Sequence, residues 1–299
     1  MLALARVVLA VAGLVAVIAL VASISFTTAT EVLPAPGGVF VEGLVGRHLG
    51  LNPLTASVNQ PDSDVAALLF SGLTRRDENG HIAPDLAERW EVSPDARQYT
   101  FLLRKGAKWH DGAPVTADDV VYTVRAIQGG EFAVTPWLAG LWKGISVERV
   151  SDLIVRFSLP EPYAPFVQCT TLGLLPAHVL AGRGEGGKEA YEASPLGTGP
   201  YRVREMKQDR LVLEAFPDHH SNANPFISRL EFRYYRDMQS ALGALKAGEV
   251  LSVAGMPVDE AAALANETGI NVYWAPMAAY TVVLLNLSLP FFEDYEVRH

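Results

Sequence analysis

Apolar residues recur along the chain at two spacings, and these spacings predict strands and helices in alternation. In residues 97–105, Tyr99, Phe101 and Leu103 alternate with more polar neighbours, which is the period of a half-buried strand. Residues 120–127 instead repeat apolar side chains every three or four positions, as one face of a helix does. The same two patterns predict strands at 38–45, 145–162, 201–220 and 227–237, and helices at 63–73, 238–250 and 258–269. The order predicts α/β lobes with mixed sheets.

The stretch KWHDGAPVTADD (108–119) lies between a predicted strand and the helix of residues 120–127. Gly112 can adopt a positive φ in a turn, Thr116 can cap the helix, and Asp119 stands three residues later as in a capping box. His110 and Asp111 form a pair that could serve catalysis or a metal, but the sequence places no third partner beside them. The turn-and-helix interpretation is therefore favoured, with His110 as a marker of the fold.

In two other segments, proline and glycine residues determine the prediction. In residues 81–92, Pro84 is suited to the first turn of a helix, so a short helix is predicted to open there. Residues 182–201 are rich in glycine and are predicted to form a loop or a boundary.

An uncharged apolar run covers residues 7–26 and follows Arg6. Its length suits a membrane-spanning helix with its N-terminus inside, and its small residues near 22–29 equally suit a cleaved signal peptide. Either interpretation places the rest of the chain outside the cytoplasm, whereas a buried core helix is disfavoured because no polar face is present. Residues 1–30 are thus expected to be a signal peptide or anchor, and residues 31–37 a linker.

Composition narrows the class of function. The 299 residues carry a formal net charge of −9, with no basic cluster, so nucleic acid is not expected as a partner. Cys169 is the only cysteine, which excludes an internal disulfide and a cysteine metal site. It is expected to be a small core residue, and no cysteine stands directly after the apolar run to carry a lipid.

Known catalytic and metal-binding motifs are absent from the sequence. There is no G-x-S-x-G, no H-E-x-x-H and no phosphate-binding glycine loop. His219 and His220 lie in a polar turn, where adjacent side chains are expected to point apart and a shared metal is disfavoured. No catalytic residue, cofactor or metal is therefore predicted.

Several stretches together resemble the family 5 extracellular solute-binding proteins, the dipeptide-, oligopeptide- and nickel-binding components of ABC importers. The likeness covers residues 38–299, and it is carried in order by residues 85–124, LPAHVL (175–180), PLGTGPYRV (195–203), residues 224–250 and residues 281–299.

The resemblance implies an α/β, periplasmic-binding-protein type II-like bilobed fold with an extra inserted domain. The first lobe would comprise residues 38–58 and 196–289, and the inserted domain residues 59–195. In the family a second, ligand-closing lobe follows a helix that should begin near Glu296, so residues 290–299 would only begin it. Three explanations stay open: a fragment, a truncated reading frame, or a partner that supplies the lobe.

The function implied by the resemblance is extracytoplasmic capture of a peptide or similar small solute and its delivery to ABC permease subunits. By position, the expected ligand-binding residues are Leu44 and Val45 at the end of the first strand and Tyr280 and Thr281 before the last. Contact with the membrane is expected only through an uncleaved N-terminal helix. The alternatives are a membrane-tethered sensor or interaction module, a non-functional remnant and an extracytoplasmic hydrolase.

Overall fold

The computed structural model describes residues 12–17, 35–221, 225–265 and 267–274, which fall into two units, Met1–Ala254 and Gly255–His299. Residues 12–17 are helical, and most of the predicted leader lies outside the described residues. Among the residues that are described, no helix has the length and apolar character needed to cross a membrane.

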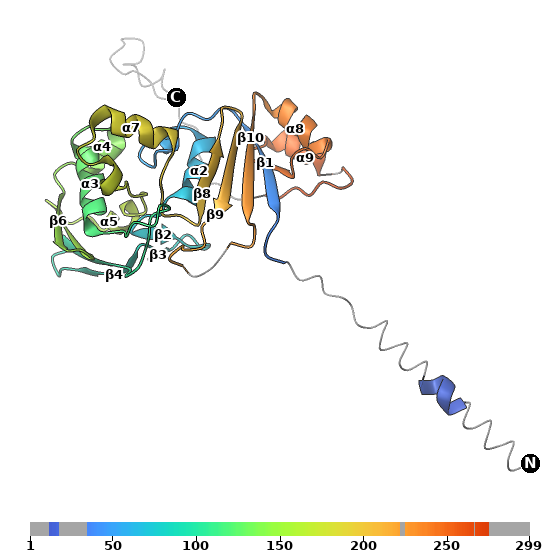
Figure 1. Ribbon diagram of the computed structural model, residues 1–299, viewed down its shortest axis with the longest axis horizontal. Helices are drawn as coiled ribbons and strands as arrows, with labels where there is room; N and C mark the ends of the chain where they lie inside the picture. Colours follow the sequence, from blue (N-terminus) through green and yellow to red (C-terminus); the bar gives the residue numbers. More distant parts are fainter. Residues whose placement is uncertain (1–11, 18–34, 222–224, 266, 275–299) are drawn as a thin grey trace, which may run out of the picture. The chain divides into compact units, whose positions relative to one another are not determined.

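A five-stranded mixed sheet forms the centre of the first unit (Figure 1). β1 (Val39–Val45) runs parallel to both of its neighbours, β10 (Arg229–Tyr235) and β11 (Ser252–Val253). β9 (Arg210–Ala215) and β8 (Tyr201–Met206) continue the sheet as an antiparallel hairpin beyond β10. The crossover from β10 to β11 is α8 (Met238–Lys246), which contacts β1 and β10.

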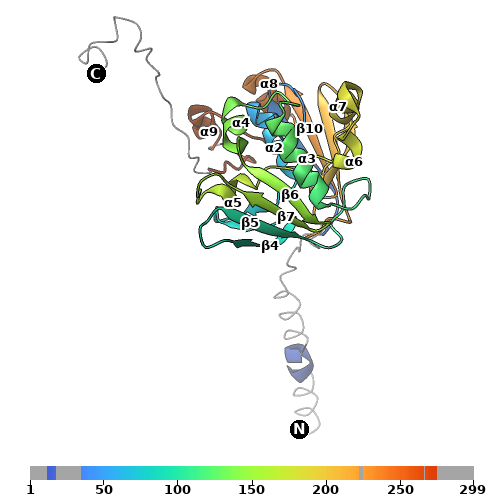
Figure 2. The ribbon, with the colours of Figure 1, turned by 90° about the vertical axis from the view of Figure 1, so that its left-hand side faces the viewer.

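A second sheet has four antiparallel strands in the order β4 (Ala87–Val92), β5 (Gln98–Leu103), β7 (Ile154–Ser158) and β6 (Ser146–Ser151). Figure 2 shows α3 (Ala117–Gln128) lying across this sheet, against β6 and β7. The alternation predicted for β5 is confirmed, because Tyr99, Phe101 and Leu103 are all buried.

Shorter elements join the two sheets. In chain order they are the 3-10 turn η1 (Ala56–Val58), α2 (Gln60–Leu69), β2 (Thr74–Arg76), β3 (Ile82–Pro84), α4 (Pro136–Trp142), α5 (Phe166–Cys169), α6 (Ala177–Leu180) and α7 (Gly184–Ala193). The second unit contains α9 (Val258–Leu264). The first sheet thus draws on residues 39–45 and 201–253 and the second on 87–158, while α2 contacts β8 of the first sheet. The exact division into a first lobe and an inserted domain stays a prediction.

Two local predictions were wrong. The helix expected to open near Pro84 is instead two strands, because the pairing of β3 with β2 and of β4 with β5 overrides the local signal of the proline. The glycine-rich segment 182–201 contains α7 rather than only a loop. Tyr191 of α7 is buried in the core, and this packing outweighs the low helix propensity of glycine.

One continuous hydrophobic core extends from Leu44 at β1 to the aromatic side chains beneath the second sheet. Phe157 and Phe166 are fully buried, with their ring centroids 5.2 Å apart in an edge-on arrangement that aromatic pairs favour. Cys169 is half-buried and packs against this core as a free thiol, as expected of a small core residue. Burial raises the pKa of its thiol, so it is a poor nucleophile.

The helix start in KWHDGAPVTADD agrees with the prediction. Gly112 has a φ of +90°, and the buried carboxylate of Asp119 accepts the backbone N–H of Thr116 at 2.8 Å. The same carboxylate also accepts the N–H of Ala177 at 2.8 Å and the indole N–H of Trp109 at 3.2 Å. Asp119 therefore holds the turn, the helix and the LPAHVL segment together.

His110 has a larger structural role than the sequence indicated, because its ring bonds the turn before α3 to the segment that leads into β8. Its Nδ1 accepts the backbone N–H of Gly197 at 3.2 Å, and its Nε2 lies 3.1 Å from the carbonyl oxygen of Gly199, which fixes the tautomer with the proton on Nε2. Both glycines belong to the segment that returns the chain to β8. Asp111 pairs separately with His178, at 2.9 Å.

Gly197 and Gly199 approach the end of α2 more closely than any other residue type could. A Cβ on Gly197 would lie 1.9 Å from the carbonyl oxygen of Leu69, and one on Gly199 would lie 2.4 Å from that of Leu68. The contact is between backbones, and the N–H of Gly199 donates to the Leu69 carbonyl at 2.8 Å.

We expect Gly197→Ala to reduce the free energy of unfolding by at least about 2 kcal/mol, because a backbone oxygen has to move to admit the methyl group. Gly243→Ala is the matched control: it lies within α8, where a Cβ would meet nothing within 4 Å, so this change should be neutral or stabilising. Urea unfolding of both variants checks the prediction, and equal effects would contradict it.

Acidic pH should also lower the free energy of unfolding through His110. Burial lowers the pKa of His110 to about 4, below its ordinary value of 6.5, so the unfolded chain takes up a proton at a pH where the folded chain does not. Stability is therefore complete above pH 6.5 and falls as the pH drops, by about 2 kcal/mol at pH 5 from this residue. Urea titrations at pH 7 and pH 5 should show a smaller loss in His110→Gln than in the parent, and an unchanged loss would refute the assignment.

Candidate functional site

The carboxyl ends of β1, β10 and β11 meet at one edge of the five-stranded sheet. In open α/β sheets, ligands bind outside the carboxyl ends of the parallel strands, so this edge is the candidate site. Leu44 and Val45 lie there as the sequence indicated. The side chain of Leu44 points into the core, only 4% exposed, so it could offer a ligand no more than its backbone. Tyr280 and Thr281 lie outside the described residues.

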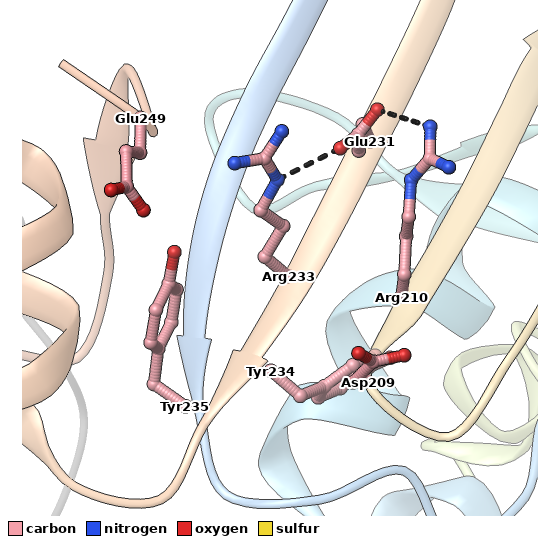
Figure 3. A pocket seen from close by; sticks show the side chains of 7 residues that line it. All are labelled: Asp209, Arg210, Glu231, Arg233, Tyr234, Tyr235 and Glu249. Atoms are coloured by element: carbon pink, nitrogen blue, oxygen red, sulfur yellow. Dashed lines mark hydrogen bonds and ion pairs between the residues drawn. The ribbon is translucent and has the colours of Figure 1, made fainter.

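A polar hollow of about 510 Å³ opens beside the end of β10. Figure 3 shows the side chains that line it, from the β9 hairpin, from β10 and from the segment that leads into β11. They are Asp209, Arg210, Glu231, Arg233, Tyr234, Tyr235 and Glu249. The hollow thus contains three acidic and two basic side chains, together with two phenol rings.

Glu231 is the centre of the hollow. It is buried, and its carboxylate accepts Arg210 Nη2 and Arg233 Nε, each at 2.8 Å and on different oxygens. This follows from strand pairing, since Arg233 lies opposite Arg210 and the alternation of β10 puts Glu231 on the same face. The hydrogen bond from Arg210 is the main reason that the pKa of Glu231 lies below its usual value despite burial.

Each arginine keeps donors that Glu231 does not use. In Figure 3 the two terminal nitrogens of Arg233 point away from Glu231, toward the side where Glu249 lies. The phenol of Tyr235 points toward Glu249, and its ring lies over Gly43, whose lack of a side chain leaves room for it. The hollow therefore offers hydrogen-bond donors and acceptors of both signs to a polar solute. None of these seven side chains is a serine, threonine, cysteine, histidine or lysine.

The loop after β1 is organised by a second carboxylate, Asp62, at the start of α2. Asp62 is 1% exposed and accepts four hydrogen bonds: His48 Nδ1 at 2.7 Å, Asn59 Nδ2 at 2.7 Å, and the backbone N–H groups of Leu49 at 2.8 Å and Gly50 at 3.1 Å. Although burial opposes the charged form, these bonds, that of His48 first, hold the pKa of Asp62 below its usual value. The loop is thus fixed around a buried negative charge.

The expectation that His219 and His220 point apart was wrong, because their ring centroids lie 4.2 Å apart. The two rings have different partners: His220 Nε2 pairs with the distant Asp85 Oδ1 at 2.6 Å, and His219 Nδ1 pairs with the neighbouring Ser221 Oγ at 2.8 Å. Across the described part of the chain, no group of three or more histidine, cysteine or acidic side chains is arranged to hold a metal ion.

Sequence reasoning missed the side chains of the hollow. The alternation in RLEFRYY was visible, and it places Arg229, Glu231, Arg233 and Tyr235 on one face. The missing information was that this face is open beside β9 and therefore brings Arg210 against Glu231. A charged residue at every second position of a predicted strand was the available signal.

Comparisons with known proteins agree with this architecture. Residues 81–299 match the family described as bacterial extracellular solute-binding proteins, family 5 Middle. The oligopeptide-binding protein AppA of Bacillus subtilis is 26% identical over 275 residues, 89% of this chain and 49% of AppA. The periplasmic oligopeptide-binding protein OppA of Escherichia coli is 28% identical over 260 residues, 80% of this chain and 47% of OppA. The chain spans about half the length of these curated relatives.

Solved structures show the same likeness. The structure of NikZ from Campylobacter jejuni in complex with Ni(L-His) aligns with a TM-score of 0.77 and 27% identity, over 87% of this chain and 52% of that one. The structure of AppA from Bacillus subtilis in complex with a nonapeptide aligns with a TM-score of 0.66 and 28% identity, over 73% of this chain and 44% of that one. The predicted α/β fold of the periplasmic-binding-protein type is confirmed, and the chain belongs to the bacterial extracellular solute-binding proteins of family 5.

Proposed function

We propose that this chain is part of the extracytoplasmic solute-binding component of an ABC importer, and that it captures peptides or similar small solutes for delivery to a membrane permease. The family match over residues 81–299 carries the proposal. It is supported by relatives named as oligopeptide-binding proteins and by a solved relative that holds a nonapeptide. An N-terminal membrane anchor and the permease partners belong to the same proposal.

The carboxyl edge suits a peptide because a peptide carries charges of both signs and a row of backbone groups. Arg233 has terminal nitrogens that do not contact Glu231 and can donate to a carboxylate, while Glu249 and Asp209 can accept from an ammonium group. Backbone groups near Leu44 and Val45 could pair with a peptide as an added strand does. Tyr280 and Thr281 stay part of the proposed site.

Binding without chemical conversion is the activity that we infer. The polar groups of the hollow are held by one another: Glu231 is paired with two arginines and is kept ionised, which suits a fixed binding surface rather than proton transfer. A binding role also agrees with an open hollow lined by polar groups, where water can fill the space that a smaller solute leaves.

The test is calorimetric titration of the chain with tri-, tetra- and penta-alanine. We expect binding by the parent and an affinity lower by about tenfold or more in Arg233→Gln, because a charge-assisted hydrogen bond is lost. Arg125→Gln changes an exposed arginine on α3, away from the hollow, and should bind as the parent does. Absence of binding by the parent, or equal losses in the two variants, would contradict the proposal.

A further inference from the structure

The side chain of His48 lies at the same carboxyl edge, in the loop that Asp62 organises. Its two ring nitrogens have different environments. Nδ1 lies 2.7 Å from the buried carboxylate of Asp62, whereas Nε2 makes no hydrogen bond within the described residues. The side chain is 14% exposed, so one part of the ring is fixed in the protein and another reaches the surface.

The hydrogen bond to Asp62 determines which nitrogen carries the proton. An ionised carboxylate can only accept, and Asp62 is kept ionised by its four donors, so Nδ1 of a neutral imidazole must donate to it. Nε2 then presents its lone pair. A carboxylate behind an imidazole also makes the opposite nitrogen a stronger acceptor, as it does for histidines that bind metals.

Several contacts fix the position of the His48 ring. Gly46, at a φ of +125°, turns the chain after β1, and Asn59 bridges the loop by donating both to Asp62 and to the carbonyl of Arg47. The ring of Tyr234, at the end of β10, lies 6.1 Å from that of His48. The imidazole is therefore held in one orientation before any solute arrives.

The neighbours of His48 on this loop also suit a solute. Leu49 and Val58 are large apolar side chains that are 61% and 69% exposed. Leu49 follows His48 directly, and Val58 precedes Asn59 of the same network. A single acceptor beside exposed apolar side chains is the composition of a small-molecule contact, in which few polar groups set orientation.

We propose that His48 is a specificity-determining residue, and that its Nε2 accepts a hydrogen bond from an N–H group of the bound solute. In a peptide this donor is either the α-ammonium group or a backbone amide. Asp62 is the positioning residue, which acts only through His48. The inference rests on the proposed function, since it assigns one polar contact within the same site.

The variant that separates the two ring nitrogens is His48→Asn. The amide nitrogen of asparagine reaches the position of Nδ1, so the bond to Asp62 and the loop can be kept, while the acceptor at Nε2 is removed. His81→Asn is the matched control, because His81 also faces an aspartate, Asp77 at 3.7 Å, but its side chain is 80% exposed on a hairpin of β2 and β3.

The experiment is calorimetric titration of both variants and the parent with tetra-alanine, with its N-acetylated form and with forms N-methylated at single amides. We expect His48→Asn to lower the affinity for tetra-alanine about tenfold and His81→Asn to leave it unchanged. One of the modified peptides should bind the parent and His48→Asn equally, and this peptide identifies the donor: the acetylated form indicates the ammonium group, a methylated form indicates an amide.

Two results would overturn the inference without touching the proposed function: tetra-alanine binding that is unchanged in His48→Asn, or a loss that is equal for every modified peptide. The second result would mean that His48 only supports the loop. Urea unfolding of His48→Asn at the level of the parent confirms that the comparison concerns binding. If the parent binds no peptide, the proposed function fails, and the inference fails with it.

Discussion

The rest of the first unit depends on the close approach of two backbones, where residues 197–199 pass the last turn of α2. The chain leaves the five-stranded sheet after β1, builds the second sheet and returns to β8, and both passages meet at this point. Only glycine admits a separation at which a Cβ would lie 1.9 Å from a carbonyl oxygen. His110 adds to this contact, because its ring accepts the N–H of Gly197 and donates to the carbonyl of Gly199. The return path, and hence the place of β8 and β9 in the sheet, is fixed by these few atoms.

Three buried carboxylates, Asp119, Glu231 and Asp62, hold neighbouring segments in place. The cost of burying each negative charge is offset by a different set of donors. Asp119 is held by neutral donors only, and burial still raises its pKa. Glu231 meets two guanidinium groups, and Asp62 meets four donors in a tight loop, so for both the charged form is favoured. The difference explains where each is used. The carboxylates with lowered pKa stand in the hollow and in the loop after β1, where a fixed charge can orient neighbouring side chains, whereas Asp119 stabilises the interior of the fold.

The sequence was sufficient for elements whose cause is local. The capping pattern of Thr116 and Asp119 and the positive φ of Gly112 were predicted because both follow from residues within one turn. The segment at β3 and β4 was misassigned because β3 forms by pairing with β2 and β4 by pairing with β5, and helix signals within the segment do not report this pairing. His219 and His220 were misjudged because Asp85 lies 135 positions from His220. The hollow could not be predicted from the alternation of β10 alone, because Arg210 arrives from β9 and Glu249 from beyond α8.

The hollow around Glu231 and the loop around Asp62 would make different kinds of contact with a bound solute. The hollow around Glu231 presents partly exposed arginine side chains that are held in place by their ion pairs with Glu231. The loop around Asp62 presents one imidazole in one orientation, with its tautomer set by a carboxylate that is 1% exposed. If the chain binds peptides as proposed, the paired charges of the hollow would contribute affinity and the oriented imidazole would fix the register of the solute. Strand polarity brings the two together: β1 and β10 are parallel, so the loop that follows one and the charged residues that end the other necessarily lie at the same edge.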